Sequence, residues 1–390
     1  MKNDGQRSLI AWGRSGLALT MFLFLVMLVS SVSSIGCCPG FADQELSYHT
    51  YDTMLSEMRR LEKAYPEIGK LHDLGLSSDG RTRVWAFKIS DNVEQEEDEP
   101  NVLLTGGIHA NEAVAPEMAL FTIRRLLAEN SRRDLVNKTQ IWVIPILNPA
   151  GHKANHSHCN ANKVDLNRNF PVAWTSDDLG AVEIELQNMI KNIHRRRAHV
   201  VAGIDIHTHG QAYLVPWAHT DKKPADWAAM KDLADKMAKT SGYRSLQLTE
   251  YLNRTIPAGA ADYLYGRYGS FHYGLEMGTS HALPAEQLGG LCRKNLPGIM
   301  LMMNRVHTST LTGHVTGSGK PLAAIVAIDG IDKPTNLRRP YTSDAAFGRY
   351  YRILLPGVYT VRFTFEGKKV VKQNVTIVND RQTVLNIEFP

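Results

Sequence analysis

The sequence lacks a strong excess of either charge, a disordered composition and an internal repeat. Its 44 Lys and Arg residues oppose 39 Asp and Glu residues, which gives a formal net charge of +5. This mild excess excludes the extended basic footprint of a nucleic-acid-binding protein. With 43% hydrophobic and 21% charged residues, the composition is that of a globular protein. Its 390 residues suffice for a large core and for two domains.

The first 42 residues have the layout of a secretory signal peptide. Three basic residues precede the apolar run GLALTMFLFLVMLVSSV, and small residues follow it, with possible cleavage after Gly36 or Ala42. An uncleaved membrane anchor is the alternative, because the run nearly reaches membrane-spanning length, and a lipid-anchored Cys37 is a third. Removing residues 1–42 takes away three basic side chains and Asp4, so the formal charge falls from +5 to +3. We therefore expect a secreted or periplasmic protein with no stable membrane span after cleavage.

Cysteine is scarce, and Cys37 and Cys38, two of the 4 cysteines, lie within this leader. The remaining pair, Cys159 and Cys292, suggests one disulfide in an exported protein, with two free thiols as the alternative. Such a disulfide would fix the loop around Cys159, which also carries His158.

Residues 48–307 alternate between strand-like and helix-like patterns. Apolar runs such as NVLLTGGIH, TQIWVIPILNP and HVVAGIDIH predict buried strands, and amphipathic segments such as PEMALFTIRRLLAEN predict helices. This alternation predicts an α/β fold, with a mostly parallel mixed sheet and helices on both faces. After Thr308, short alternating strands with Gly and Pro turns predict a small all-β sandwich. The predicted boundaries are a signal peptide at 1–42, an α/β domain at 43–308 and a β-sandwich at 309–390.

Polar residues follow several predicted strands at their carboxyl ends, where ligands gather in an open α/β sheet. His109 and Glu112 follow one strand, His207 ends another, and Glu276 lies at or near the end of a third. Two imidazoles and a carboxylate are zinc ligands, and a catalytic zinc keeps a fourth position for water. Zinc lowers the pKa of its water to about 7, and a carboxylate that is not a ligand can take the proton, a role that Glu276 fits. Taken alone, His109 and Glu112 would equally suit a capped helix start.

At these residues the sequence resembles the zinc carboxypeptidases. GGIHANEAVAPE is similar to the family's metal-binding His-x-x-Glu segment, and VDLNRNFP to its most recognisable motif. GIDIHTHGQAYLVPW resembles the strand with the third ligand, and FHYGLEMG the strand with the catalytic Glu. The C-terminal stretches LTGHVTGSGKPLAAIVAI and RYYRILLPGVYTVRF are similar to the transthyretin-like domain of the regulatory (N/E-type) subfamily. The resemblance covers nearly all of the chain after the leader, so residues 43–308 would form the catalytic domain.

The resemblance also implies roles for individual residues. One zinc ion per chain would have three ligands: His109, Glu112 and His207. The implied reaction is hydrolysis of the C-terminal peptide bond of peptides or proteins by zinc-activated water, with Glu276 as general base and then general acid. Arg168 would pair bidentately with the terminal carboxylate of the substrate, and Asn167 would add a hydrogen bond.

Three departures from the family pattern concern the substrate side. The Arg that usually stabilises the oxyanion is replaced by His158, and losing one such donor typically costs about 10²–10³ in rate. The family's mobile Tyr would fall at Arg254, so either Tyr251 replaces it or Arg254 supplies a second carboxylate-binding cation. The Asp that selects Lys or Arg is absent from LVPWAHT, where Ala218 stands, and Ala261 occupies a position that is often polar. We therefore expect no preference for basic C-terminal residues.

Two other functions remain open at the level of the sequence. A cell-wall peptide carboxypeptidase would keep the chemistry on a different peptide, and a zinc-binding pseudoenzyme would act as a binding module. His209 would point away from His207 if the strand continued, and three ligands are already supplied without it. The expected partners are peptide or protein C-termini, and no nucleic acid.

Overall fold

The computed structural model describes residues 46–390 except 155–157, 173–178, 196–199 and 258. The predicted signal peptide, its cleavage points and Cys37 and Cys38 lie outside the described residues. Among the described residues, none of the helices combines the length and hydrophobicity that a membrane-spanning segment needs. By its internal contacts, the chain from Ala42 to Pro390 forms one unit.

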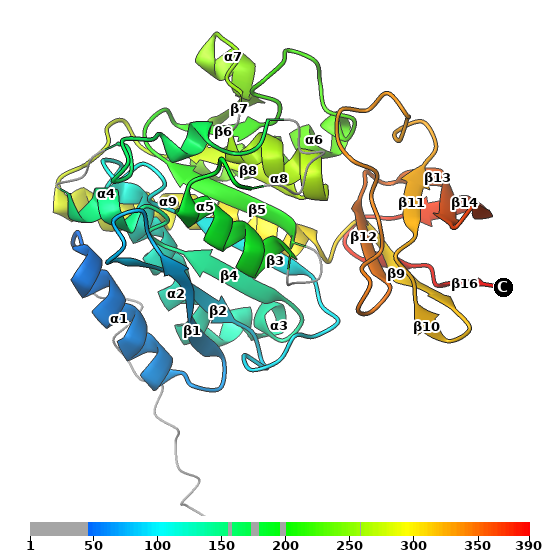
Figure 1. The fold of residues 1–390 in the computed structure, drawn as a ribbon, viewed down its shortest axis with the longest axis horizontal. Coiled ribbons are helices and arrows are strands. Elements are labelled where there is room, and N and C mark those ends of the chain that lie inside the picture. Colours follow the sequence, from blue (N-terminus) through cyan, green and yellow to red (C-terminus); the bar gives the residue numbers. More distant parts are fainter. Residues whose placement is uncertain (1–45, 155–157, 173–178, 196–199, 258) are drawn as a thin grey trace, which may run out of the picture. The chain divides into compact units, whose positions relative to one another are not determined.

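An eight-stranded mixed sheet forms the centre of the α/β part (Figure 1). In spatial order its strands are β1 (Gly69–Leu76), β2 (Arg83–Ile89), β4 (Gln140–Ile144), β3 (Asn101–Thr105), β5 (Val200–His207), β8 (Phe271–Glu276), β6 (Ala212–Val215) and β7 (Arg244–Gln247). The pairings that join β4, β3, β5 and β8 are parallel, as is that of β6 with β7, and the others are antiparallel. Every residue of β3, β4 and β5 is buried, as in a sheet covered on both faces. The predicted fold class is confirmed.

Helices cover both faces of this sheet. The α-helices of the described residues are α1 (Tyr51–Ala64), α2 (Val114–Ala128), α3 (Arg133–Val136), α4 (Pro149–Lys153), α5 (Ile184–Met189), α6 (Trp227–Ser241), α7 (Leu248–Leu252), α8 (Ala260–Tyr268) and α9 (Ala285–Arg305). Neighbouring residues of β8 show the two faces, because successive side chains of a strand point to opposite sides. Tyr273 donates its hydroxyl to the Met230 carbonyl of α6 at 3.2 Å. His272 instead lies near His194 of a π-helical turn, Ile190–Arg195.

Helix α9 is longer than the sequence pattern predicts. The apolar segment NLPGIMLMMNRVHTS predicts a start near Asn295, whereas the helix begins at Ala285 and contains Pro297. Gly289 and Gly290 weaken the helical signal in the first part. Packing forms the helix nonetheless, because Leu288 and Cys292 are fully buried one turn apart.

The expected disulfide between Cys159 and Cys292 is not formed, and both thiols are free. The two residues lie in different surroundings. Cys292 is buried in α9 near Glu117 of α2, whereas Cys159 is partly exposed in a loop near Asp165. Burial raises the pKa of the Cys292 thiol, which keeps it protonated and unreactive.

Residues 309–390, here called the C-terminal β region, form two smaller sheets (Figure 1). The first contains β9 (Thr310–Gly317), β10 (Lys320–Pro321), β12 (Arg349–Ile353), β15 (Gln382–Val384) and β16 (Ile387–Phe389). The second contains β11 (Ile325–Ile328), β13 (Gly357–Phe365) and β14 (Lys368–Ile377). Apolar side chains of both sheets form one buried cluster that includes Leu311, Val326 and Phe363. The all-β character is as predicted, and the transthyretin-like assignment and the domain boundaries stay predictions.

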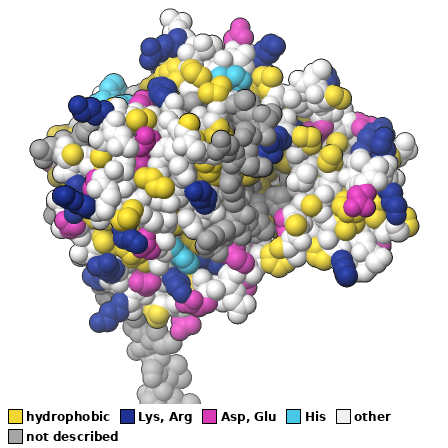
Figure 2. Space-filling model, in the orientation of Figure 1, with side chains coloured by type: hydrophobic (Ala, Val, Ile, Leu, Met, Phe, Trp, Pro, Cys, Tyr) yellow, Lys and Arg dark blue, Asp and Glu magenta, His cyan; other side chains and the backbone are white. Residues whose placement is uncertain are grey.

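The surface carries both signs of charge. Figure 2 shows one face of the molecule, on which Lys and Arg side chains are interspersed with Asp and Glu. Such mixing on this face is in keeping with the small formal net charge of +5.

Candidate zinc and substrate site

A tight turn after β3 brings His109 and Glu112 to the carboxyl end of the sheet. Gly107 has φ +59°, a conformation that favours glycine. At Gly106 a Cβ atom would lie 2.8 Å from the Ala115 carbonyl oxygen, so a side chain there would clash with the backbone. Helix α2 starts at Val114 without any side-chain capping bond. The helix-cap alternative for His109 and Glu112 therefore finds no support.

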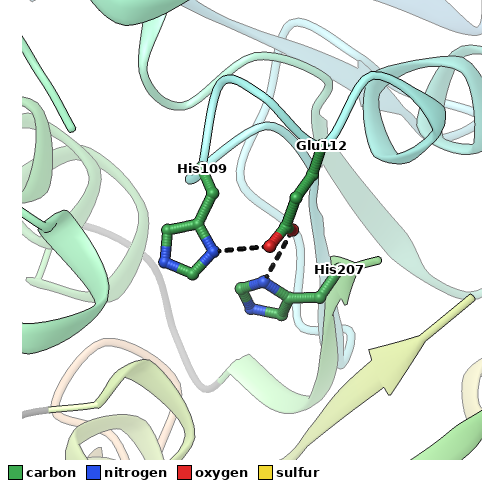
Figure 3. Close-up of side chains that lie close together, drawn as sticks. All are labelled: His109, Glu112 and His207. Carbon is green, nitrogen blue, oxygen red and sulfur yellow. Dashed lines mark hydrogen bonds and ion pairs between the residues drawn. The ribbon is translucent and has the colours of Figure 1, made fainter. Parts of the chain in front are cut away.

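Glu112 lies between two histidines from different segments (Figure 3). Its Oε1 is 2.8 Å from His109 Nδ1, and its Oε2 is 3.0 Å from His207 Nδ1 at the end of β5. Oε2 also accepts the backbone N–H of Thr208 at 3.2 Å. One ligand atom from each of His109, Glu112 and His207 lies within 4.8 Å of the others, and all three residues are buried. The structure thus brings the three predicted ligands together.

The same group fits a zinc ion by its donors and by its surroundings. Two imidazole nitrogens and a carboxylate are common zinc ligands and leave a fourth position open. The second nitrogen of each ligand ring also has a neighbour: His109 Nε2 is 3.2 Å from Asp165 Oδ1, and His207 Nε2 is 3.3 Å from Asn167 Nδ2. The Asp165 carboxylate is a partner of the kind that orients a metal-binding histidine, whereas the Asn167 Nδ2 group is itself a hydrogen-bond donor.

Asp165 was not singled out from the sequence, although it lies in the quoted motif VDLNRNFP. The signal that could have found it is a carboxylate three residues before Arg168, within the motif that resembles the family. Burial opposes ionisation of Asp165, but hydrogen bonds to His109 and His158 hold its pKa well below its usual range.

Charge within the site is set by the balance of burial and close partners. Burial opposes the ionised form of Glu112, yet His207 and His109 hold its pKa far below its usual range. Burial lowers the pKa of His207, but Glu112 outweighs this effect and raises it to about 9. Glu276 pairs in register with His207 on the adjacent strand. Burial raises the pKa of the Glu276 carboxyl to about 7, with His207 acting against the rise.

Several of the predicted site residues line one pocket of about 80 Å³. Its polar lining includes His109, Asn167, Arg168, His207 and Glu276, which come from four separate segments of the chain. Its aliphatic lining includes Leu214, Ala218, Leu252, Ile256, Ala260 and Ala261. The convergence expected at the carboxyl ends of the strands is therefore present in the structure.

Two further carboxylates, Asp205 and Asp262, line the pocket, and neither was predicted from the sequence as a site residue. Asp262 accepts the backbone N–H groups of Ala218 at 2.8 Å and of His219 at 2.9 Å. Asp205 accepts the hydroxyl of Thr105, and its Oδ1 is 3.2 Å from His272 Nε2. Asp205 lies two residues before His207, so the period of two along a strand could have placed it on the same face.

His158 lies directly against the ligand group. Its ring stacks on His109 with the ring centroids 4.0 Å apart. Its Nε2 is 3.2 Å from Asp165 Oδ2, and its Nδ1 is 3.3 Å from Asn111 Oδ1. An oxygen atom thus faces each ring nitrogen of His158, so either nitrogen can donate a hydrogen bond there.

Tyr251 in α7 and Arg254 just after this helix have different surroundings. Tyr251 donates its hydroxyl to the His209 carbonyl at 2.8 Å, and burial raises the pKa of Tyr251 to about 12. Arg254 is exposed and does not line the pocket. His209 is exposed beyond the end of β5, and among the described residues it belongs to no potential metal-binding group.

Comparison with known protein families decides the wider class of this site. The family model described as zinc carboxypeptidase matches residues 54–298, more than half of the chain. The chain belongs to the zinc carboxypeptidase family, and thus to the metallocarboxypeptidases, which are peptide hydrolases.

Several curated proteins are similar to this member of the family. Carboxypeptidase SOL1 of Arabidopsis thaliana is 26% identical over 83% of this chain and 68% of its own length. The carboxypeptidase N catalytic chain of Homo sapiens is 24% identical over 95% of this chain and 90% of its own length. Carboxypeptidase D of Rattus norvegicus is 24% identical over 88% of this chain, which spans only 27% of that relative.

Solved structures show the same fold. The structure of thrombin-activatable fibrinolysis inhibitor aligns with a TM-score of 0.61 and 18% identity, covering 68% of this chain and 77% of that one. Carboxypeptidase A from Helicoverpa armigera aligns with a TM-score of 0.59 and 19% identity, covering 67% and 73%. At these identities the likeness concerns the fold alone.

Proposed function

We propose that this protein is a zinc-dependent carboxypeptidase that hydrolyses the C-terminal peptide bond of peptides or proteins. The observation that carries the proposal is that the group of three candidate ligands lies at one pocket, which His109, His207, Glu276 and Arg168 line at the carboxyl edge of the sheet. Zinc bound by His109, Glu112 and His207 would supply a Lewis acid and lower the pKa of water to about 7.

The remaining roles fall to residues that line the pocket and to others near it. Arg168 pairs with the terminal carboxylate, because a planar guanidinium matches that group with two hydrogen bonds, and Asn167 adds a further hydrogen bond. Glu276 takes a proton from the attacking water and passes it to the leaving amine. From its place against His109, His158 would support the oxygen on which negative charge develops by turning a ring N–H away from Asp165 or Asn111. Tyr251 closes over the bound end of the peptide, and Arg254 contributes only if its loop moves.

The pocket wall favours an apolar C-terminal side chain. Its free lining is aliphatic, because both oxygens of Asp262 already accept backbone N–H groups and Asp205 is held by Thr105 and His272. Ala218 contributes no charge at the position where basic specificity would need one. We therefore propose that Leu or Phe at the C-terminus is released faster than Lys or Arg.

We also propose that the protein belongs to the regulatory subfamily and is located outside the cytoplasm. Support for the subfamily comes from the C-terminal β region and from the likeness to the carboxypeptidase N catalytic chain over 95% of this chain. Support for export comes from the leader-like composition of residues 1–42.

The experiment measures bound zinc by elemental analysis and the release of C-terminal residues from a mixed peptide library. We expect one zinc per chain, release by the wild type and no release by Glu276→Gln, which keeps the ligands. Zinc binding without release would refute the proposal and favour a binding module. Release only from peptides that contain D-residues would instead favour cell-wall peptides.

A further inference from the structure

Helix α8 begins at the substrate pocket. Ala260 and Ala261 line the pocket, and the backbone N–H of Ala260 donates to Asn167 Oδ1 at 2.9 Å. Asn167 in turn lies 3.3 Å from His207. The position of the first turn of α8 therefore sets both a wall of the pocket and the orientation of Asn167.

The other end of α8 is held by the C-terminal β region. The last carbonyls of a helix have no partner within the helix. Here the backbone N–H of Arg339 donates to the Gly266 carbonyl at 2.8 Å, and the Tyr341 hydroxyl donates to the Gly269 carbonyl at 2.7 Å. Gly269 has φ +71°, and a Cβ there would lie 2.2 Å from the Tyr341 ring, so only glycine allows this contact.

Buried ionic groups keep the segment 338–341 in place. Arg338 Nε donates to Asp226 Oδ2 at 2.8 Å, and Asp226 also accepts the hydroxyl of Tyr265 from α8 at 2.7 Å. The guanidinium carbons of Arg338 and Arg352 lie 4.3 and 4.0 Å from the centre of the Tyr341 ring. Both cations can attract the face of the Tyr341 ring, and these contacts help to fix the side chain whose hydroxyl bonds the end of α8.

We propose that the C-terminal β region acts as a brace for the active site: through Tyr341 and the backbone of Arg339 it positions α8, and α8 positions the pocket wall and Asn167. This inference rests on the proposed carboxypeptidase function for its kinetic consequence. Tyr341 is a positioning residue, because it touches neither the pocket nor the candidate ligands. Helix α8 connects the Tyr341 contact to the pocket. It has 9 residues with a rise of about 1.5 Å each, so the connection is short.

The test is Tyr341→Phe in the full chain, with Tyr359→Phe as the matched control. Tyr359 lies in the same region and donates its hydroxyl to the Leu355 carbonyl at 2.9 Å, away from α8. In Tyr341→Phe we expect faster amide hydrogen exchange across residues 260–268 and a KM raised about threefold to tenfold, as for the loss of one partly buried hydrogen bond. We expect kcat within about twofold of wild type and one zinc per chain, because the ligands come from other elements.

The outcomes separate the possible failures. Equal exchange and equal KM in the two variants would overturn the brace, as would faster exchange of α8 with an unchanged KM. A loss of zinc in Tyr341→Phe would also overturn it, because the effect would then pass through the ligands. Wild-type protein that binds zinc but releases no residue would refute the proposed function alone, and the exchange of α8 would still decide whether Tyr341 holds the helix.

Discussion

Replacing Asp226 with Asn removes one charge from a buried ionic group. Asp226 is 3% exposed and accepts hydrogen bonds from Tyr265 at 2.7 Å, from Arg338 at 2.8 Å and from Arg352 at 3.3 Å. Both guanidinium groups also contact Asp332, so the four ionic side chains are balanced in charge. In the Asn variant two buried cations would share the single negative charge of Asp332.

The expected cost follows from this imbalance. Removing one partner of a buried ion pair typically destabilises a protein by about 3–5 kcal/mol, because the remaining charge is left without compensation. At about 2.1 cal/mol/K of unfolding entropy per residue, this cost lowers the Tm of a chain of 390 residues by about 4–6 °C. Calorimetry of the full chain measures the shift, and urea unfolding gives the corresponding loss of free energy.

An exposed ion pair of the same region serves as the control. Arg362 and Asp329 form a bidentate pair in which the side chains are 52% and 41% exposed. Exposed pairs contribute little to stability because water screens them, so Asp329→Asn should change Tm by less than about 2 °C. A shift in Asp226→Asn no larger than that in Asp329→Asn would refute the reasoning, because burial would then make no difference to the energy of the pair.

Three further outcomes are expected. Burial, with Glu97 and Asp91 nearby, raises the pKa of Glu99 to about 7 from 4.5, so its contribution to stability is present below pH 4.5 and is lost as the pH rises through 7. Glu99→Gln should therefore stabilise the protein against urea by about 1 kcal/mol at pH 8 and not at pH 4, and equal effects at both would contradict this. Ala218→Asp should shift release from peptides ending in Leu towards those ending in Lys by at least about tenfold in kcat/KM, and an unchanged ratio would place the specificity elsewhere. His158→Ala should lower kcat by about 10² and leave zinc binding intact, whereas His158→Arg should retain activity; equal loss in both would argue against a cationic role.

Much of the site follows from local patterns in the sequence. Buried strands are recognisable as apolar runs, and polar residues directly after them must lie at one edge of a parallel sheet. His109, Glu112, His207 and Glu276 could be assigned on that basis, and the structure brings them to one place. Asp205 could have been predicted as a site residue in the same way, from its spacing of two residues from His207, but it was not.

Other features depend on packing between distant segments. The disulfide prediction was wrong, because pairing two cysteines requires their spatial separation, which the residue count does not contain. The early start of α9 was missed, because burial of Leu288 and Cys292 outweighs the weak helical preference of Gly289 and Gly290.

The sequence by itself determined the fold class and the strand ends at which the candidate ligands lie, since these depend on residue type and short-range periodicity. Only the tertiary structure decided that His158 stacks on His109, that Asp165 contacts both rings, and that Tyr341 reaches the end of α8. The physical reason is the distance along the chain over which each kind of interaction acts. Hydrophobic periodicity acts over a few residues, whereas these contacts arise when separately formed elements pack, and their partners are set by shape and charge in three dimensions.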